Sequence, residues 1–207
     1  MAWIGSWPFM PWCRGEYDTS DLGWYGSISI PRQINLCSDG KLRSQPILEV
    51  EQLRHTPRLY ESKVIDENNP FVFEAGDGVH CEILATFDLS QSNAGIIGFR
   101  LRGSKDQETL LEFDLSQGEM VFDRRKSGNI SAQTRRCLLE SARQSQLFVR
   151  LLMDSISVEV FTDGGRTVMT NNIFSDPLSK NLSIYTKSGY ASLKSLKTYG
   201  LKSITNE

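Results

Sequence analysis

The chain has 207 residues, with 23 basic and 25 acidic side chains and a formal net charge of -2. This length suits one large β domain or two small ones, and a hydrophobic share of 39% is enough for a folded core. A nearly balanced charge gives no positive field that would attract phosphate backbones or anionic lipid, so we expect neither nucleic acid nor a membrane as a partner.

The first 26 residues are unusually rich in aromatic side chains. All four tryptophans of the chain, Trp3, Trp7, Trp12 and Trp24, lie there together with Phe9. Large rings exposed to water are unfavourable, so this segment is expected to pack on something or to line a ligand surface. An unpaired strand would also expose backbone groups, so we expect it to fold back on the chain or to pair with a second copy in a homodimer.

From residue 27 onward the sequence breaks into short β-patterned runs between turn residues, which is typical of a sandwich rather than an α/β fold. The clearest run is 79–89, where Cys81 and Ile83 begin one face and Glu82 lies on the other. The stretch 134–144 is expected to be a solvated loop or short turn. Further strands are expected at 27–36, 94–102, 108–115, 119–124, 147–154, 157–162, 167–171, 182–186 and 190–203.

Glycine-containing tripeptides punctuate these runs, and glycine supplies the positive φ that tight hairpin turns require. The turn Asp163-Gly164-Gly165 lies between two β-patterned runs, so residues 158–168 are predicted to form a hairpin. The sequence as a whole predicts an all-β fold, a two-sheet antiparallel β-sandwich of the concanavalin-like jelly-roll type.

The cysteines are far apart and form no CxxC pair, so neither a zinc knuckle nor a redox motif is expected. We interpret them as mostly buried small apolar residues, with one or two disulfides left open if the protein is secreted. They are Cys13, Cys37, Cys81 and Cys137.

The two histidines, His55 and His80, have no metal-ligand spacing and no neighbouring Ser or Cys arranged for nucleophilic attack. Each is expected to be an ordinary surface or core residue. The sequence therefore predicts no metal site and no cofactor.

Three pieces together resemble glycoside hydrolase family 32, the group of invertases, levanases and fructan hydrolases. The stretch from Trp3 to Phe9, followed by 24–32, looks like the closing strands of the family's five-bladed propeller. Residues 121–128 are similar to its Asp-Arg-x-x-Ser-Gly turn, and 151–165 to its Asp-x-Ser-Ser-Val-Glu-Val-Phe hairpin. Ser6, Phe9 and Ile156 depart from the family pattern. The residues that carry the two later motifs are Asp123, Arg124, Ser127, Gly128, Asp154, Ser157, Glu159, Phe161 and Gly164.

The resemblance implies that residues 1–26 are a remnant of the last propeller strands and that 27–207 are the β-sandwich that follows. It implies a β-propeller catalytic domain as the partner, and a fructan or sucrose as the substrate of the whole enzyme. It would also place more sequence upstream, so the location, secreted or cytoplasmic, stays open.

No catalytic residue is expected in this chain. Retaining glycoside hydrolysis needs two carboxyl groups about 5 Å apart. The family motifs that would carry them, Trp-x-Asn-Asp-Pro-Asn, Arg-Asp-Pro and Glu-Cys, do not occur. Asp154 and Glu159 are expected to have structural roles, such as a turn hydrogen bond or an ion pair with Arg150 or Arg124. The cluster 123–126 is expected to be a solvated turn.

Three functions remain open on the sequence. The first is an accessory, structural module that buries an interface against the propeller. The second is a fructan-binding module that stacks fructose units on rings such as Trp7, Trp12 or Trp24, because the C–H faces of sugars pack against aromatic planes. The third is a chain that supplies part of a glycosidase active site once a propeller chain is present. The isolated chain is expected to release no fructose.

Overall fold

Two large antiparallel sheets make up most of the molecule. The structure is a computed structural model that describes residues 7–9, 12–13, 27–128 and 133–203. Among these residues, one sheet has seven strands in the order β16-β15-β14-β9-β18-β6, with β7 also paired to β18. Its strands are β6 (Arg54–Tyr60), β7 (Lys63–Ile65), β9 (Cys81–Asp88), β14 (Gln146–Asp154), β15 (Ser157–Thr162), β16 (Thr167–Asn172) and β18 (Ala191–Leu201).

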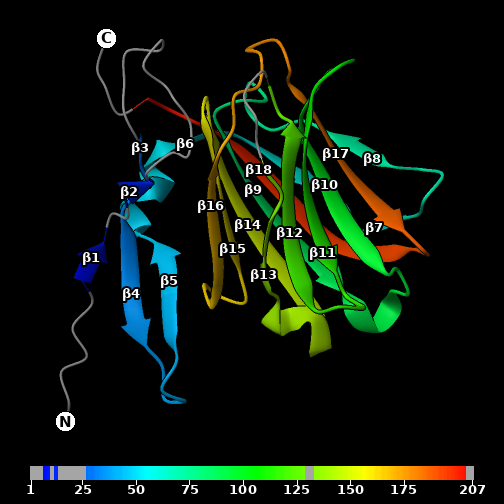
Figure 1. Ribbon diagram of the computed structural model, residues 1–207, viewed down its shortest axis with the longest axis horizontal. Helices are drawn as coiled ribbons and strands as arrows, with labels where there is room; N and C mark the ends of the chain where they lie inside the picture. Colours follow the sequence, from blue (N-terminus) through cyan, green and yellow to red (C-terminus); the bar gives the residue numbers. More distant parts are fainter. Residues whose placement is uncertain (1–6, 10–11, 14–26, 129–132, 204–207) are drawn as a thin grey trace.

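The second large sheet has six strands within the described residues, in the order β13-β12-β11-β10-β17-β8. Figure 1 shows the two sheets packed as layers. The strands of this sheet are β8 (Phe71–Phe73), β10 (Ile96–Gly103), β11 (Glu108–Asp114), β12 (Glu119–Lys126), β13 (Arg135–Leu138) and β17 (Asn181–Lys187).

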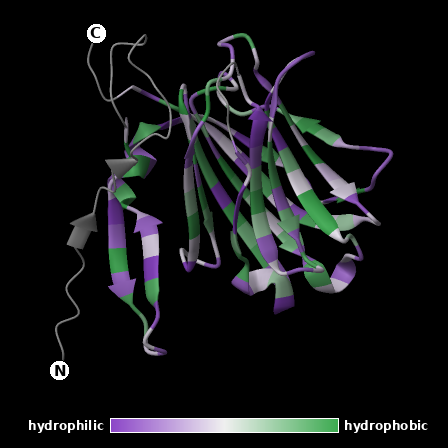
Figure 2. Cartoon of the chain, in the orientation of Figure 1, coloured by the Kyte–Doolittle hydropathy of each residue, from purple (hydrophilic) through white to green (hydrophobic). Residues whose placement is uncertain are grey.

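The hydrophobic core lies between the two sheets. Cys81 and Ile83 of β9 are 0% exposed, as the alternation in the sequence predicts. Phe99 of β10 packs edge-on against Phe87 at 6.1 Å and against Phe113 at 6.2 Å between ring centroids. Figure 2 shows hydrophobic and hydrophilic bands alternating along the strands. The predicted all-β fold, a two-sheet antiparallel sandwich, is confirmed.

A small sheet lies beside the sandwich, at the left of Figure 1. It consists of β1 (Trp7–Phe9), β4 (Arg32–Leu36) and β5 (Leu42–Pro46), while β2 (Trp12–Cys13) pairs with β3 (Ser27–Ile28). A 3-10 turn, η2 (Leu48–Leu53), joins β5 to the sandwich strand β6. Strands β4 and β5 follow the expected division at residues 26 and 27, yet they pair with β1 and with each other. The division into domains stays a proposal.

The stretch 134–144, expected to be a loop or short turn, contains an edge strand. It forms β13, which pairs with β12 so that Cys137 lies opposite Met120, and then a 3-10 turn, η4 (Glu140–Arg143). Pairing with a neighbour that is already part of the core makes this polar segment a strand, and its own periodicity does not show it.

The cluster 123–126 is the end of strand β12, and the expectation of a solvated turn is wrong. Arg124 is only 4% exposed, and its Nη1 donates to the carbonyl oxygen of Asn172 at 2.9 Å. Ser127 Oγ donates to the carbonyl oxygen of Arg124 at 2.8 Å, and the N–H of Phe174 donates to the carbonyl oxygen of Ser127 at 3.2 Å. The Arg-x-x-Ser-Gly motif therefore ties β12 to the segment that follows β16, and so joins the two sheets.

Gly128 ends this motif at a position where a side chain does not fit. Its φ is +142°, and an added Cβ would lie 2.0 Å from the carbonyl oxygen of Phe174. We therefore expect Gly128→Ala to lower the free energy of unfolding by more than the roughly 1–3 kcal/mol of a backbone outlier alone. Gly40→Ala is the matched control, because φ is +76° there but nothing lies within 4 Å of the new Cβ. Urea unfolding of both variants measures the difference, and equal losses would contradict the proposed steric role of Gly128.

Candidate functional site

The outer face of the seven-stranded sheet has a buried carboxylate at its centre. Glu82, on β9, is 0% exposed, which the sequence did not indicate. Arg54 donates to it from Nε at 2.5 Å and from Nη2 at 3.0 Å, and Arg150 donates from Nε at 2.6 Å. The hydrogen bond to Glu82 raises the pKa of Arg54 above its ordinary value. Two guanidinium groups on β6 and β14 thus surround one carboxylate on the strand between them in space.

A second buried ion pair joins this face to the small sheet. Glu159 of β15, 3% exposed, accepts a hydrogen bond from Arg32 Nη2 of β4 at 2.5 Å and another from the N–H of Ile30 at 2.7 Å. The Arg32 guanidinium also donates to Thr170 Oγ1 and lies over the Phe161 ring, 5.1 Å from its centroid. The sequence suggested Arg150 or Arg124 as the ion-pair partner of Glu159, but the partner is Arg32.

The predicted hairpin at 158–168 is confirmed as β15 and β16, and its turn contacts the small sheet. Asp163, Gly164 and Gly165 all have positive φ. The N–H of Ser44 on β5 donates to the carbonyl oxygen of Gly165 at 2.8 Å, and a Cβ on Gly165 would lie 2.3 Å from the carbonyl oxygen of Ser44. Only glycine permits this approach, so the turn holds β5 against the edge of the sandwich.

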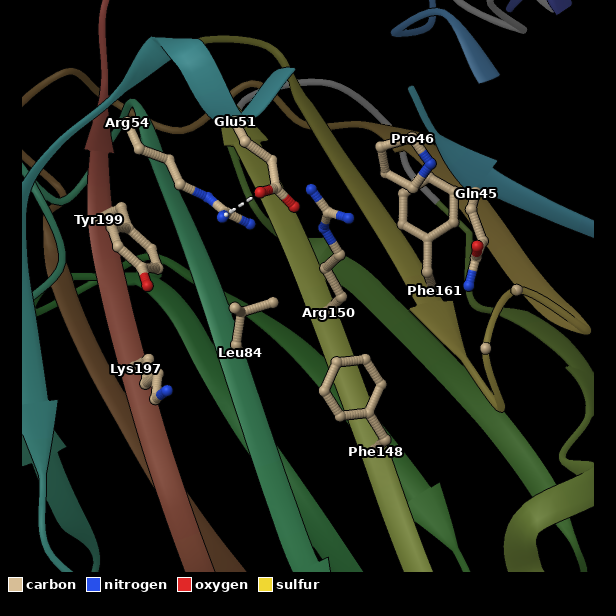
Figure 3. Close-up of a pocket in the computed structure, with 12 residues that line it drawn as sticks. Gln45, Pro46, Glu51, Arg54, Leu84, Phe148, Arg150, Phe161, Lys197 and Tyr199 are labelled. Carbon is tan, nitrogen blue, oxygen red and sulfur yellow. Dashed lines mark ion pairs between the residues drawn. The ribbon is translucent and has the colours of Figure 1, made fainter. Parts of the chain in front are cut away.

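A hollow of about 390 Å³ opens where the sheet, β5 and η2 meet. Figure 3 shows Phe148, Arg150 and Leu84 rising from the sheet, with Gln45 and Pro46 on one side and Tyr199 on the other. The Arg54 guanidinium lies over the Tyr199 ring, 4.7 Å from its centroid, and pairs with Glu51 at 3.0 Å. The hollow is therefore a polar notch. It lies at the border between the part of the outer face that the small sheet covers and the part that it leaves open.

Beyond the notch the outer face of the sandwich is open and partly apolar. Phe148 is 41% exposed and Leu59 is 71% exposed. Lys197 lies opposite both Leu59 on β6 and Leu84 on β9 in the strand register. An exposed aromatic and exposed aliphatic residues beside a covered surface indicate a contact area.

Comparison with known proteins decides the family. The family model described as "Glycosyl hydrolases family 32 C terminal" matches residues 49–200. The chain belongs to this C-terminal family of the family 32 glycosyl hydrolases. It is 29% identical to a levanase of Bacillus sp. (strain L7) over 100% of the chain and 23% of the relative. It is 32% identical to a sucrose-6-phosphate hydrolase of Zymomonas mobilis over 98% of the chain and 38% of the relative.

Solved structures of family 32 enzymes share the fold. Fructan 1-exohydrolase IIa from Cichorium intybus superposes with a TM-score of 0.79 and 16% identity, covering 93% of this chain and 44% of that one. Sucrose-6-phosphate hydrolase from Lactobacillus gasseri gives 0.76 and 19% identity, covering 97% and 40%. This chain spans less than half the length of each of these relatives and structures.

Two of the five aromatic residues proposed to bind sugar lie outside the described part of the chain. Trp3 and Trp24 are not described, and for Trp7, Phe9 and Trp12 the structure gives only backbone pairing in β1 and β2. Their proposed role in binding a fructan stays a prediction.

The family hairpin motif has mainly structural contacts. Phe161 is 2% exposed under the Arg32 guanidinium, and Ser157 lies opposite Asn172 in the ladder of β15 and β16. Asp154 accepts a hydrogen bond from the N–H of Ser155 at 2.7 Å. This bond is the turn interaction expected for Asp154.

His80 does not stand alone, which corrects the expectation from the sequence. Its Nδ1 lies 2.8 Å from Asp77 Oδ2, and its Nε2 lies 2.9 Å from Ser155 Oγ. Ser155 is 75 residues further along the chain, so no local motif could have indicated the contact. His55 contacts only its neighbour Thr56, through Nδ1 and Oγ1 at 2.9 Å, among the hydrogen bonds of the described residues.

The three cysteines whose side chains the structure describes, Cys37, Cys81 and Cys137, are free. Cys81 is fully buried, and burial raises its pKa to about 12, so the thiol is unreactive at neutral pH. Within the described ranges no group of three His, Cys, Asp or Glu side chains is placed to hold a metal ion. Among the same residues, no helix is long and apolar enough to cross a membrane.

Proposed function

We propose that this chain is an accessory, structural module that stabilises the β-propeller catalytic domain of a β-fructosidase and contributes no catalytic residue to the hydrolysis of fructosyl bonds. The observation that carries the proposal is the half-covered outer face of the seven-stranded sheet. On one half, the small sheet is fixed by the buried pair of Arg32 and Glu159 and by the bond from Ser44 to Gly165. The other half, around Phe148 and Leu59, is open.

The open half suits a second domain for three reasons. It continues an existing contact, it exposes Phe148 and Leu59, and the buried carboxylate of Glu82 beside it is already paired with Arg54 and Arg150. The relatives extend well beyond this chain, which is consistent with a further domain as the occupant. Their names, levanase and sucrose-6-phosphate hydrolase, support a fructan or a sucrose derivative as the substrate of the whole protein.

The proposal is tested by mixing the chain with a separately produced β-propeller chain of a family 32 β-fructosidase. We expect binding measurable by calorimetry, a higher melting temperature of the propeller, and no fructose release by this chain alone. The non-catalytic role would be contradicted if the chain alone released fructose from sucrose, levan or inulin at a rate that stays the same through further purification. If hydrolysis appears only in the mixture, and depends on a carboxylate of this chain, the module also completes the active site.

Phe148→Asp is expected to weaken this association at least tenfold, because it places a charge in the centre of the proposed contact. A buried interface aromatic typically contributes more than 1 kcal/mol, which corresponds to about a fivefold change or more, and an unpaired buried carboxylate adds to the loss. Leu138→Asp is the matched control, since Leu138 is 77% exposed on β13 of the other sheet. Equal weakening by both variants, or by neither, would rule out the outer face as the contact.

A further inference from the structure

Asp77, His80 and Ser155 form a hydrogen-bonded series that none of the proposed structural roles requires. Asp77 lies in the turn before β9, and Ser155 lies in the tight turn between β14 and β15. His80 joins them, with its Nδ1 2.8 Å from Asp77 Oδ2 and its Nε2 2.9 Å from Ser155 Oγ. Both Ser155 and His80 are exposed, so a substrate can reach them.

The direction of the hydrogen bonds follows from the state of Asp77. Partial burial acts to raise the pKa of this carboxyl, but hydrogen bonds from the His80 ring and from the N–H groups of His80 and Val79 outweigh it and lower the pKa to about 2. An ionised carboxylate can only accept, so Nδ1 of His80 must carry the proton. In neutral imidazole Nε2 is then the acceptor, and the hydroxyl of Ser155 donates to it. Asp154 Oδ1 lies 3.5 Å from the same Nε2, so this second carboxylate favours the charged imidazole that forms when His80 takes the serine proton.

This is the order of groups that activates a serine: a base within hydrogen-bond reach of the hydroxyl, and a carboxylate that orients the base. The turn that carries Ser155 is held from behind by Arg102, which is 1% exposed and donates from Nη1 to the carbonyl oxygen of Ser155 at 3.4 Å. Asp154 holds the N–H of Ser155 at 2.7 Å. The turn that carries the Ser155 hydroxyl is therefore held in place by hydrogen bonds on both sides.

A cavity of about 780 Å³ is lined in part by His80 and Asp154, which both contact Ser155, although Ser155 itself is not part of the lining. Its lining includes the apolar side chains of Ile30, Val50 and Leu201, which come from the linker, from η2 and from the end of β18. An apolar cavity beside a polar reactive group is the common form of a small-molecule site, and here it suits an aliphatic acyl chain.

The geometry points to Ser155 as a nucleophile, with His80 as its base and Asp77 as the positioning residue, in the hydrolysis of carboxylic esters that carry an apolar acyl group. Ser155 Oγ attacks the carbonyl carbon while its proton passes to His80 Nε2. The bond from that carbon to the alcohol oxygen breaks, and the alcohol leaves with the proton. Water then cleaves the acyl-serine, with His80 taking and returning a proton in the same way.

The N–H of Ser155 is already donated to Asp154, so it does not stabilise the oxyanion of the intermediate. We therefore expect catalysis of the size that a general base provides, about 10²–10⁴-fold, on activated aryl esters rather than on amides.

The test uses the whole chain with p-nitrophenyl butyrate as substrate and a fluorophosphonate as covalent probe. We expect ester hydrolysis above the buffer rate and a phosphonyl adduct on Ser155 by mass spectrometry. Ser155→Ala and His80→Ala should each lower the enzymatic rate at least about 100-fold, in line with loss of the base-assisted step. The matched controls Ser116→Ala, at an exposed turn serine bonded to Asp114, and His55→Ala should keep the full rate.

Asp77→Asn separates orientation from structure. The amide oxygen can still accept from the N–H groups of Val79 and His80, which both bond to Oδ1, but the amide nitrogen would donate to Nδ1 and reverse the tautomer of His80. We expect kcat to fall while KM and the melting temperature stay unchanged. A wild-type chain that takes no adduct on Ser155, or that hydrolyses the ester no faster than Ser155→Ala, would overturn the proposal.

Discussion

Replacing Glu82 with alanine is expected to lower the free energy of unfolding by about 3–5 kcal/mol, because it leaves two largely buried guanidinium groups without their shared carboxylate. The side chains of Arg54 and Arg150 are 17% and 15% exposed. Arg150 Nη2 is already buried without a hydrogen-bond partner among the described residues. No nearby acceptor is therefore expected to replace the lost carboxylate of Glu82. Urea unfolding followed by circular dichroism measures the loss.

Glu119→Ala is the matched control for Glu82→Ala. Glu119 also accepts from an arginine, Arg136 at 2.9 Å, but the arginine side chain is 60% exposed and the glutamate 34%. Exposed ion pairs contribute about 0–1 kcal/mol, so this variant should be nearly as stable as the wild type. If the two variants lose equal stability, the buried cluster is not the source of the effect.

The central strands were predictable because a single physical rule governs them. Residues 81–88 alternate between the core and the outer face, and the ladder with β14 repeats this alternation along its whole length. Turn glycines with positive φ, such as Gly164 and Gly165, then fix where the strands end. Local sequence therefore determined the sandwich.

The edge strands β6 and β13 were not predictable in the same way. Strand β6 contains Pro57 and a left-handed residue, Thr56, with φ +45°, and its register with β18 shifts beside Gly200. Proline is tolerated at an edge because one side of the strand needs no ladder hydrogen bond. Only pairing with its neighbour β18 makes this polar segment a strand, and the two strands lie far apart in the sequence.

The candidate sites depend on contacts that a single local pattern does not contain. Glu82 meets arginines 28 and 68 residues away, and Glu159 meets Arg32 at a separation of 127. The sequence placed Glu82 on the polar face of a half-buried strand, which is correct, but it did not show that η2 and β5 cover part of that face. Knowing the face of a residue is therefore not enough to know its partner.

Arg102 carries the second large predicted effect. It is the next-to-last residue of β10, with φ +51°, at an irregularity in the ladder with β17, and its side chain is 1% exposed. Burial lowers the pKa of this guanidinium below its ordinary value. Its charge is compensated by carbonyl oxygens: Nε donates to Ser179 at 2.8 Å and Nη2 to Asp176 at 3.1 Å. These bonds hold the segment before β17 against the end of the sandwich.

We expect Arg102→Ala to lower the free energy of unfolding by about 3–5 kcal/mol, since each hydrogen bond from a charged group contributes about 1.5–3 kcal/mol. Arg102→Gly should lose about 1 kcal/mol less than Arg102→Ala, because glycine adopts positive φ without strain. At the exposed neighbour Arg100, which has no positive φ, glycine should instead be the more destabilising of the two substitutions. Urea unfolding of the four variants measures these free energies. If glycine is more destabilising than alanine at both positions, the left-handed backbone at Arg102 stores no strain, and the contribution of Arg102 to stability comes from its carbonyl contacts alone.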